Sequence, residues 1–168
     1  MIQKKICMVG MFGTGKTSLI RQFVYSKFSD KYHSSVGVKI DRKQVHLGDA
    51  TVNLLLWDLA GKDDFEDLQT SYLRGSAGLF FVADGTRRNS YDQLFELRRL
   101  AFETIGDVPY VVALNKADLT DLWALQQQDY DALTKAHWHV LRTSAKTGNG
   151  VNEAFYWLAA EMIKNKAT

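Results

Sequence analysis

A glycine-rich segment near the start of the chain carries residue types that bind phosphate. Residues 10–17 read Gly-Met-Phe-Gly-Thr-Gly-Lys-Thr and fit the pattern G-x-x-x-x-G-K-[ST]. Glycines let the backbone point successive N–H groups at an anion, while Lys16 offers a charge to the outer phosphates and Thr17 a hydroxyl to Mg²⁺. This 10–17 segment therefore predicts a site for nucleotide phosphates, against the alternative of a glycine-rich turn that binds nothing.

Three more polar segments follow apolar runs of strand type. They are Asp58, residues 115–118 (Asn-Lys-Ala-Asp) and residues 144–146 (Ser-Ala-Lys). In an open sheet of mostly parallel strands, ligands bind beside the carboxyl ends of the strands. Because the 10–17 segment also follows an apolar run, we expect all four segments to meet in one crevice.

The elements that must position these residues alternate between strand and helix patterns, which predicts an α/β fold. Apolar alternation predicts a β-hairpin over residues 38–57, with a turn at 48–50. Continuous apolar runs at 78–83 and 110–114 are typical of strands covered on both faces. We therefore expect a mostly parallel sheet with helices on both faces and one antiparallel strand at its edge.

Helical spacing of apolar residues fills most stretches between the strands. Residues 90–93 (Ser-Tyr-Asp-Gln) fit a capping box, which predicts that a helix begins there and continues to about Thr104. A short strand is expected at 139–142. The other expected helices are 17–25, 61–73, 127–136 and 151–163.

Composition favours one domain and excludes some classes of partner. The chain has 168 residues, 46% of them hydrophobic, and a net charge of +2 from 21 basic and 19 acidic residues. Since no run of five like charges occurs, we expect no nucleic-acid partner. The single cysteine, Cys7, is expected to be a small buried hydrophobe in a reducing compartment.

The ends of the chain carry no targeting signal of a familiar kind. We see no signal peptide, no membrane span, no C-terminal prenylation box and no glycine after Met1. We therefore expect a cytoplasmic protein with no direct membrane anchor in this chain. We also expect a monomer.

These segments, in this order, resemble the Ras superfamily of small GTP-binding proteins, and its Rab-like branch most closely. Residues 58–61 (Asp-Leu-Ala-Gly) are similar to the family's D-x-x-G, residues 115–118 to its N-K-x-D, and residues 144–146 are identical to its S-A-K. Residues 72–75 and 83–86 also look Rab-like. The resemblance implies a P-loop NTPase with a Ras-like G domain over residues 1–168 and a six-stranded sheet.

The chemistry of the base agrees with this resemblance. Guanine presents N1–H and N2–H₂ as adjacent donors, which an ionised Asp118 can accept in a fork, whereas adenine offers no such pair. By resemblance Asn115 braces the neighbouring loops, Lys116 lies along the base and the Ala145 N–H meets the guanine O6. Phe28 is expected to stack edge-on against the ring. An ordinary surface lysine is the alternative for Lys116.

The resemblance also implies a magnesium site. Mg²⁺ prefers six oxygen ligands and usually takes few of them from protein. Thr17 is the first candidate, and Ser35 is the second, standing where the family usually has threonine and retaining the hydroxyl. Asp58 would hold a metal-bound water, and the Gly61 N–H would meet the γ-phosphate.

Three sets of candidate residues follow. The nucleotide-binding set is Gly13, Thr14, Gly15, Lys16, Thr17, Ser18, Phe28, Ser35, Gly61, Asn115, Lys116, Asp118, Ser144, Ala145 and Lys146. The metal set is Thr17, Ser35 and, through water, Asp58. The catalytic set is Lys16, Gly61 and Lys62, the last at the position of the family's usual glutamine.

Two residues depart from the family in ways that affect hydrolysis. Phe12 replaces a small residue, commonly glycine, and Lys62 replaces the glutamine that orients the attacking water. A bulky ring would crowd that water, and a lysine ammonium donates hydrogen bonds but accepts none. We therefore expect slow hydrolysis, although Lys62 could instead stabilise charge on the leaving oxygens.

The first functional hypothesis is a switch that binds GTP or GDP with Mg²⁺, hydrolyses GTP slowly and binds effectors when loaded with GTP. Effector, exchange and activating proteins are expected to bind through residues near 30–40 and 59–73. The second hypothesis is a hydrolysis-deficient scaffold that stays bound to GTP. A third, an ordinary phosphate-loop kinase or ATPase, leaves residues 115–118 and 144–146 unexplained.

Overall fold

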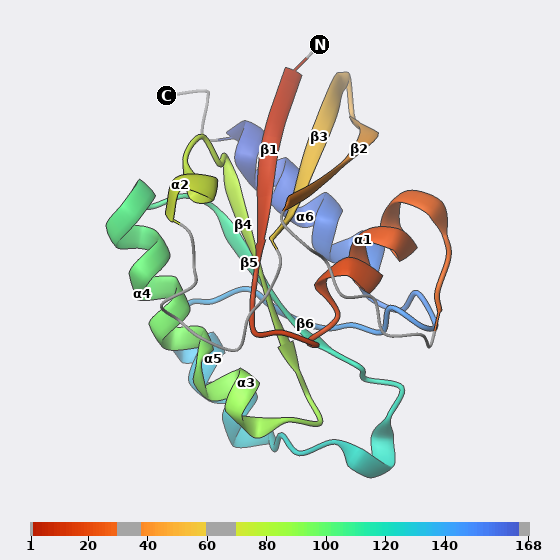
Figure 1. Ribbon diagram of the computed structural model, residues 1–168, viewed down its shortest axis with the longest axis vertical. Helices are drawn as coiled ribbons and strands as arrows, with labels where there is room; N and C mark the ends of the chain where they lie inside the picture. The colour runs from red at the N-terminus through yellow and green to blue at the C-terminus, as the bar shows by residue number, and fades with distance from the viewer. Residues whose placement is uncertain (1, 30–37, 60–69, 165–168) are drawn as a thin grey trace.

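A twisted sheet runs through the computed structural model, with helices on both of its faces (Figure 1). The structure describes residues 2–29, 38–59 and 70–164. Within these ranges six strands form one sheet in the order β2-β3-β1-β4-β5-β6. All neighbouring pairs are parallel except β2 and β3, so the predicted α/β fold and the antiparallel edge strand are confirmed.

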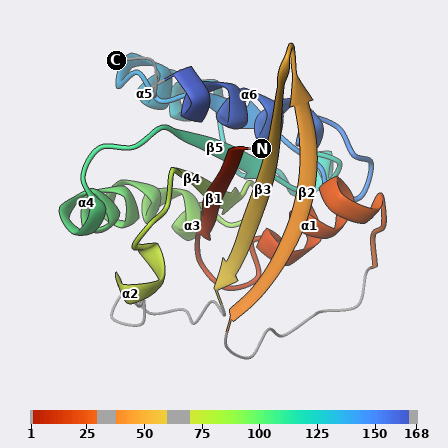
Figure 2. The ribbon, with the colours of Figure 1, turned by 90° about the horizontal axis from the view of Figure 1, so that it is seen from above.

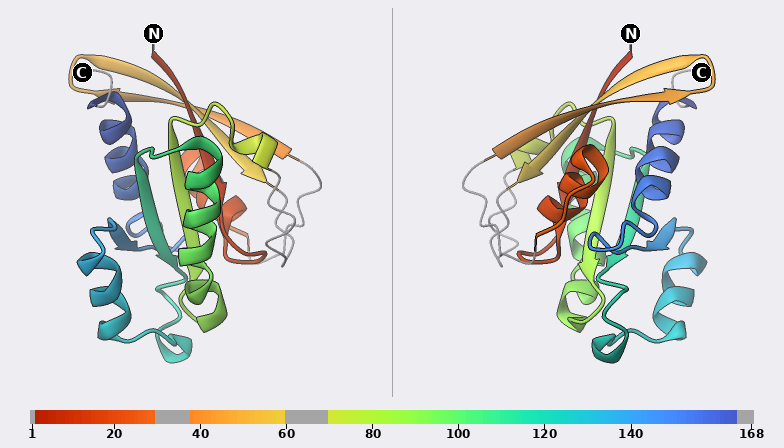
Figure 3. Two further views of the ribbon diagram at one scale, coloured as in Figure 1. Left: turned by 90° about the vertical axis from the view of Figure 1, so that its left-hand side faces the viewer. Right: turned by 90° about the vertical axis from the view of Figure 1, so that its right-hand side faces the viewer.

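The strands differ in burial as their sequences predict. The central strands β4 and β5 lie under helices on both faces and are almost wholly buried, whereas the edge strand β2 alternates between exposed and buried residues. Figure 3 shows the long β2–β3 hairpin at the edge of the sheet. The strands are β1 (Ile2–Val9), β2 (Val38–Leu47), β3 (Ala50–Leu59), β4 (Gly78–Asp84), β5 (Tyr110–Asn115) and β6 (Val140–Arg142).

The helices pack on the two faces of the sheet, and Figure 2 shows α1 and α4 on opposite sides of β1. Helices α1 and α6 contribute to one core, in which Phe155 stacks on Phe23 with ring centroids 4.2 Å apart, and α4 and α5 contribute to the core on the other face. The helices are α1 (Lys16–Tyr25), α2 (Thr70–Leu73), α3 (Arg88–Asp92), α4 (Leu94–Ile105), the 3₁₀ helix η2 (Thr120–Leu122), α5 (Gln127–Lys135) and α6 (Val151–Lys164).

The capping box predicted at residues 90–93 is wrong. Helix α3 begins earlier, at Arg88, and Ser90 lies inside it. The Ser90 hydroxyl donates to the carbonyls of Asp84 and Arg87 and accepts the N–H of Asp84. The hydroxyl that would cap a helix N-terminus is therefore bonded to the end of β4 instead. A capping box that the sequence reading missed joins Gln126 and Asp129 at the start of α5.

Two other expectations concern single segments. Cys7 is buried as predicted, and burial raises the pKa of its thiol to about 12, which makes it unreactive at neutral pH. Of the helix expected over 61–73, the structure describes only Thr70–Leu73, and the rest lies outside the described residues. None of the helices in the described ranges is both long and apolar enough to span a membrane.

Candidate functional site

The carboxyl ends of neighbouring strands place polar residues side by side. In the parallel ladders Met8 of β1 is paired with Asp58 of β3, and Asp84 of β4 is paired with Asn115 of β5. The 10–17 segment leaves the same end of β1 and enters α1 (Figure 1). The register of the strands therefore brings the 10–17 segment, Asp58, Asp84 and Asn115 to the end of the sheet where the carboxyl ends of its parallel strands lie.

Glycines in the 10–17 segment permit close backbone approach. Gly15 has φ 105°, in the left-handed region, and a Cβ placed on it would lie 2.2 Å from the Asn115 amide nitrogen. A Cβ on Gly10 would lie 2.4 Å from the carbonyl oxygen of Val82. Since real Cβ contacts are never that short, larger residues would force the segment away from β4 and β5.

Lys16 is held inside the loop that precedes its own helix. Its Nζ donates to the carbonyls of Gly10 at 2.6 Å and Met11 at 3.4 Å, and the side chain is buried. Burial lowers the pKa of Lys16, while the nearby Asp58 carboxylate acts against that shift. An anion in the loop would also favour the charged ammonium, so the site is electrostatically suited to phosphate.

Thr17 and Asp58 bring two oxygen atoms together at the start of α1. Along β3 the buried side chains alternate through Val52, Leu54 and Leu56, and Asp58 continues that face, toward α1. The Thr17 hydroxyl donates to the Asp58 carboxylate, and burial raises the pKa of Asp58. This pair of hard oxygen donors fits a magnesium ion that keeps most of its waters.

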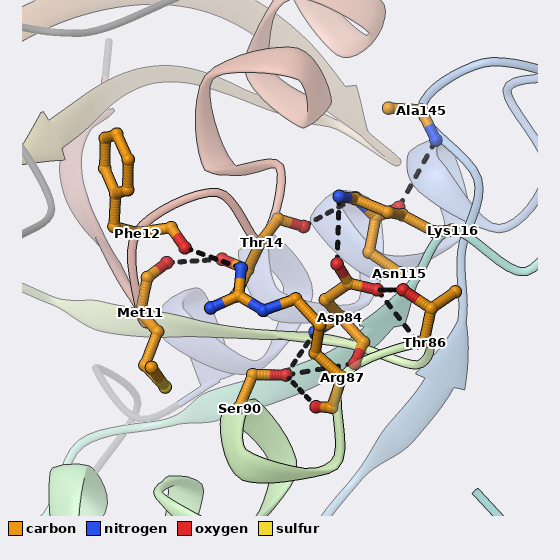
Figure 4. A network of polar contacts seen from close by, with 10 residues as sticks. All are labelled: Met11, Phe12, Thr14, Asp84, Thr86, Arg87, Ser90, Asn115, Lys116 and Ala145. Atoms are coloured by element: carbon orange, nitrogen blue, oxygen red, sulfur yellow. Dashed lines mark hydrogen bonds and ion pairs between the residues drawn. The ribbon is translucent and has the colours of Figure 1, made fainter. Parts of the chain in front are cut away.

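Asn115 connects the 10–17 segment to the loop that follows β6. Its amide nitrogen donates to the Thr14 carbonyl at 3.0 Å, and its amide oxygen accepts the Thr143 hydroxyl at 3.0 Å and the Ala145 N–H at 3.3 Å. The side chain is 1% exposed, so these bonds form away from water. Figure 4 shows the bonds of Asn115 to Thr14 and Ala145. One buried amide thus fixes the spacing between two of the predicted segments.

Asp118 and Ser144 meet at the outer side of this site. The Ser144 hydroxyl donates to the Asp118 carboxylate at 2.8 Å and accepts the Thr147 N–H at 3.1 Å. The contact fixes the direction of a carboxylate that is only partly buried. Lys146 and Phe28 are both exposed, with 39% of Phe28 accessible.

Asp84 belongs to the site, although the sequence reading did not include it. Lys116, in a left-handed conformation with φ 69°, places its Nζ 2.9 Å from the Asp84 carboxylate. The other Asp84 oxygen accepts the N–H and hydroxyl of Thr86. Its position as a buried acid ending an apolar strand is the signal that could have identified it.

Arg87 is the second residue that the sequence reading missed. Its guanidinium donates to the backbone carbonyl of Phe12 at 2.9 Å, across 75 positions of sequence (Figure 4). Nothing in the local sequence distinguishes it from the neighbouring Arg88, which pairs instead with Asp129 of α5. Only the fold separates the two arginines.

Three predicted site residues, Ser35, Gly61 and Lys62, lie outside the described residues. Of the residues expected around the hydrolytic water, the structure therefore describes Phe12 but not Gly61 or Lys62. In the described part of the chain, no cluster of three or more His, Cys, Asp or Glu side chains could hold a metal.

Comparison with known proteins agrees with this arrangement. The profile of the Ras family matches residues 5–164. Over 167 residues the chain is 32% identical to Ras-related protein Rab-1 of Theileria annulata, covering 98% of this chain and 76% of that protein. It is 34% identical to Rab-4A of Bos taurus over 164 residues (95% and 74%) and 29% identical to Rab-8B of Pongo abelii over 161 residues (95% and 78%).

Proposed function

The chain belongs to the Ras family, and from this premise we propose that it is a guanine-nucleotide switch that binds GTP and GDP with Mg²⁺. The observation that carries the proposal is the Asn115 side chain, which ties the 10–17 segment to the loop containing Ala145. A phosphate site and a base site are thereby held at a fixed separation, as one nucleotide would require. The similarity of this chain to Rab proteins supports the same conclusion.

Guanine selectivity in this proposal comes from Asp118. Its carboxylate is oriented by Ser144, and an ionised carboxylate accepts the paired donors of guanine that adenine does not offer. The backbone N–H of Ala145 would serve the base on the other side. A kinase or ATPase that binds an adenine nucleotide would not need these contacts to guanine, so that class of protein is the weaker alternative.

Thr17 and Asp58 would hold Mg²⁺, directly and through water respectively, and Ser35 would complete the protein ligands. When bound, the ion neutralises charge on the outer phosphates. Lys16 adds a buried positive charge to the same phosphates, and it is already oriented by the Gly10 carbonyl. These residues account for binding without any assumption about turnover.

Hydrolysis in this proposal is slow. Phe12 places an aromatic ring at a position where the family has a small residue, and Lys62 stands where the family has the water-orienting glutamine. Both replacements concern the hydrolytic water, so we expect them to affect turnover and not nucleotide binding. A protein in which these replacements abolish turnover would be the GTP-bound scaffold of the second hypothesis.

Effector, exchange and activating proteins would bind near residues 30–40 and 59–73. At the described border of this region Ile40 is 45% exposed and lies opposite Trp57 in the β2–β3 ladder. Lys5 places its Nζ 3.6 Å above the Trp57 ring and donates to the Tyr72 carbonyl, which joins β1, β3 and α2 into one surface. Such a partly apolar surface is suited to a protein partner.

The first experiment is the nucleotide content and specificity of the purified protein. Chromatography of the released nucleotide and titration with GTP, GDP and ATP should show guanine nucleotides only. Lys16→Ala should weaken every nucleotide irrespective of base, because it removes phosphate contacts alone. Equal affinity for ATP and GTP would overturn the proposal.

Hydrogen exchange separates the switch from the scaffold. Contacts to the γ-phosphate and its Mg²⁺ should order residues 29–38 and 59–68 only in the GTP state. Most of these residues lie outside the described ranges, so this expectation comes from the sequence. Equal exchange with GDP and with a non-hydrolysable GTP analogue would exclude the switch and leave the scaffold.

A further inference from the structure

The 10–17 segment is held from outside by two side chains on different strand ends. Asn115, the last residue of β5, donates to the carbonyl of Thr14, and Arg87, which follows β4, donates to the carbonyl of Phe12. Figure 4 shows both bonds reaching the segment from the side of β4 and β5, while the Phe12 ring points away from the Arg87 guanidinium. The contact therefore involves the Phe12 backbone.

A bond to a carbonyl oxygen also orients the N–H of the same peptide unit. The peptide is planar and trans, so its C=O and N–H point in opposite directions. Fixing the Phe12 carbonyl toward Arg87 turns the Gly13 N–H away from Arg87. In the same way, the Asn115 bond to Thr14 directs the N–H of Gly15. Both glycines have positive φ, so their neighbouring peptides would otherwise have more conformational freedom.

Arg87 is itself rigidly placed. Its N–H donates to the Asp84 carbonyl at 2.9 Å, and its carbonyl accepts the Ser90 N–H at 3.0 Å and the Ser90 hydroxyl at 2.7 Å. Ser90 is 1% exposed, and Asp84 is fixed by Thr86 and Lys116. The guanidinium therefore extends from a backbone that has little freedom to move.

The donor on Arg87 is charged, unlike the amide of Asn115. A charged donor forms a stronger hydrogen bond and polarises the peptide that accepts it, which makes the N–H at the other side a better donor. We propose that Arg87 is a positioning residue that holds and polarises the Phe12–Gly13 peptide, so that the Gly13 N–H faces the phosphates of the nucleotide. This inference rests on the proposed nucleotide binding.

The test uses the GDP-bound protein with Mg²⁺, labelled with ¹⁵N, and four variants. Arg87→Ala and Arg87→Gln remove the charge, Arg87→Lys keeps a charged donor, and Arg88→Ala removes the neighbouring guanidinium that pairs with Asp129. The amide proton of Gly13 should move upfield in the first two variants and return part of the way in the lysine variant. The Gly15 amide should stay in place, and Arg88→Ala should move neither.

Dissociation of a fluorescent GDP analogue gives the second measurement. Arg87→Ala should release it roughly tenfold faster, the effect of losing one charge-assisted hydrogen bond, and Arg87→Lys should recover part of the loss. A Gly13 amide and a release rate equal to those of wild type would overturn the inference. Equal shifts at Gly13 and Gly15 without rescue by lysine would also overturn it, because they indicate general loosening.

Failure of the proposed function would be recognised separately. A wild-type chain that binds no guanine nucleotide would contradict that function, yet the Gly13 resonance of the nucleotide-free chain would still report whether Arg87 orients this peptide. If the chain binds GDP normally but Arg87→Ala causes no shift of the Gly13 amide, the proposed function stands and Arg87 does not position the Phe12–Gly13 peptide.

Discussion

The side-chain amide of Asn115 donates to the backbone carbonyl of Thr14 at 3.0 Å, although the two residues are 101 positions apart. The same side chain accepts hydrogen bonds from Thr143 and Ala145. One residue thus joins the part of the site suited to phosphate to the part suited to a base. Movement of either part must strain the other through a buried amide.

Replacing Asn115 should therefore damage both stability and binding. Asn115→Ala removes three hydrogen bonds and leaves the Thr143 hydroxyl and the Thr14 carbonyl buried without this partner, at a cost of about 1–3 kcal/mol. Thermal unfolding should shift to lower temperature and GDP should dissociate faster. The exposed Asn152→Ala on α6 is the matched control. A variant that retains GDP like the control would show that the bridge is dispensable.

Replacing Asp118 should change which base is bound. Asp118→Asn should weaken GTP and GDP and favour xanthine nucleotides, whose edge has an acceptor where guanine has its amino group. Competition titrations with GDP and xanthosine diphosphate measure this exchange of preference. Asp121→Asn, at an exposed position on η2, should leave it unchanged. Unaltered guanine affinity in Asp118→Asn would remove this carboxylate from the base site.

Phe12 and Lys62 should limit the rate of hydrolysis. We expect wild-type turnover no faster than roughly 10⁻³ s⁻¹, the scale of Ras-type proteins without a helper. Single-turnover assays of Phe12→Gly, Lys62→Gln and the double variant should find the double variant fastest. The two effects should be non-additive because both changes act on one water. A large loss of rate in Lys62→Gln would instead mean that lysine stabilises the leaving oxygens.

Asp129 should make stability depend on acid pH. The Arg88 hydrogen bond lowers the pKa of Asp129 below its ordinary value of 3.8. A carboxylate with a lowered pKa stabilises the fold fully above its unfolded pKa, and this contribution is lost as pH falls through the folded pKa. The difference in melting temperature between wild type and Asp129→Asn should therefore shrink below about pH 4.

The control for this pH dependence is Asp131→Asn, an exposed acid on the same helix. Its melting temperature should follow that of wild type across the range. A constant difference in melting temperature between wild type and Asp129→Asn from neutral pH to about pH 2 would show that the Arg88–Asp129 pair contributes nothing to the loss of stability at acid pH.

The sequence by itself determined the strands, most helices and the four segments that carry chemistry. These features depend on local patterns: apolar runs, helical spacing and the glycine and lysine pattern of the 10–17 segment. The position of Asp58 was also readable, because side-chain alternation along β3 continues into it. Because the strands are parallel, the segments that follow them must lie at the same end of the sheet, beside the carboxyl ends of the strands.

Only the tertiary structure decided which polar side chains meet there. The fold bonds Arg87, and not Arg88, to the Phe12 carbonyl, and it pairs Lys116 with Asp84. It also bonds the Ser90 hydroxyl to the end of β4, where the sequence pattern predicts a helix cap. Each of these is a choice among several donors and acceptors of similar local sequence. Such choices depend on distances between strands that are remote in the chain, and a local pattern carries no information about those distances.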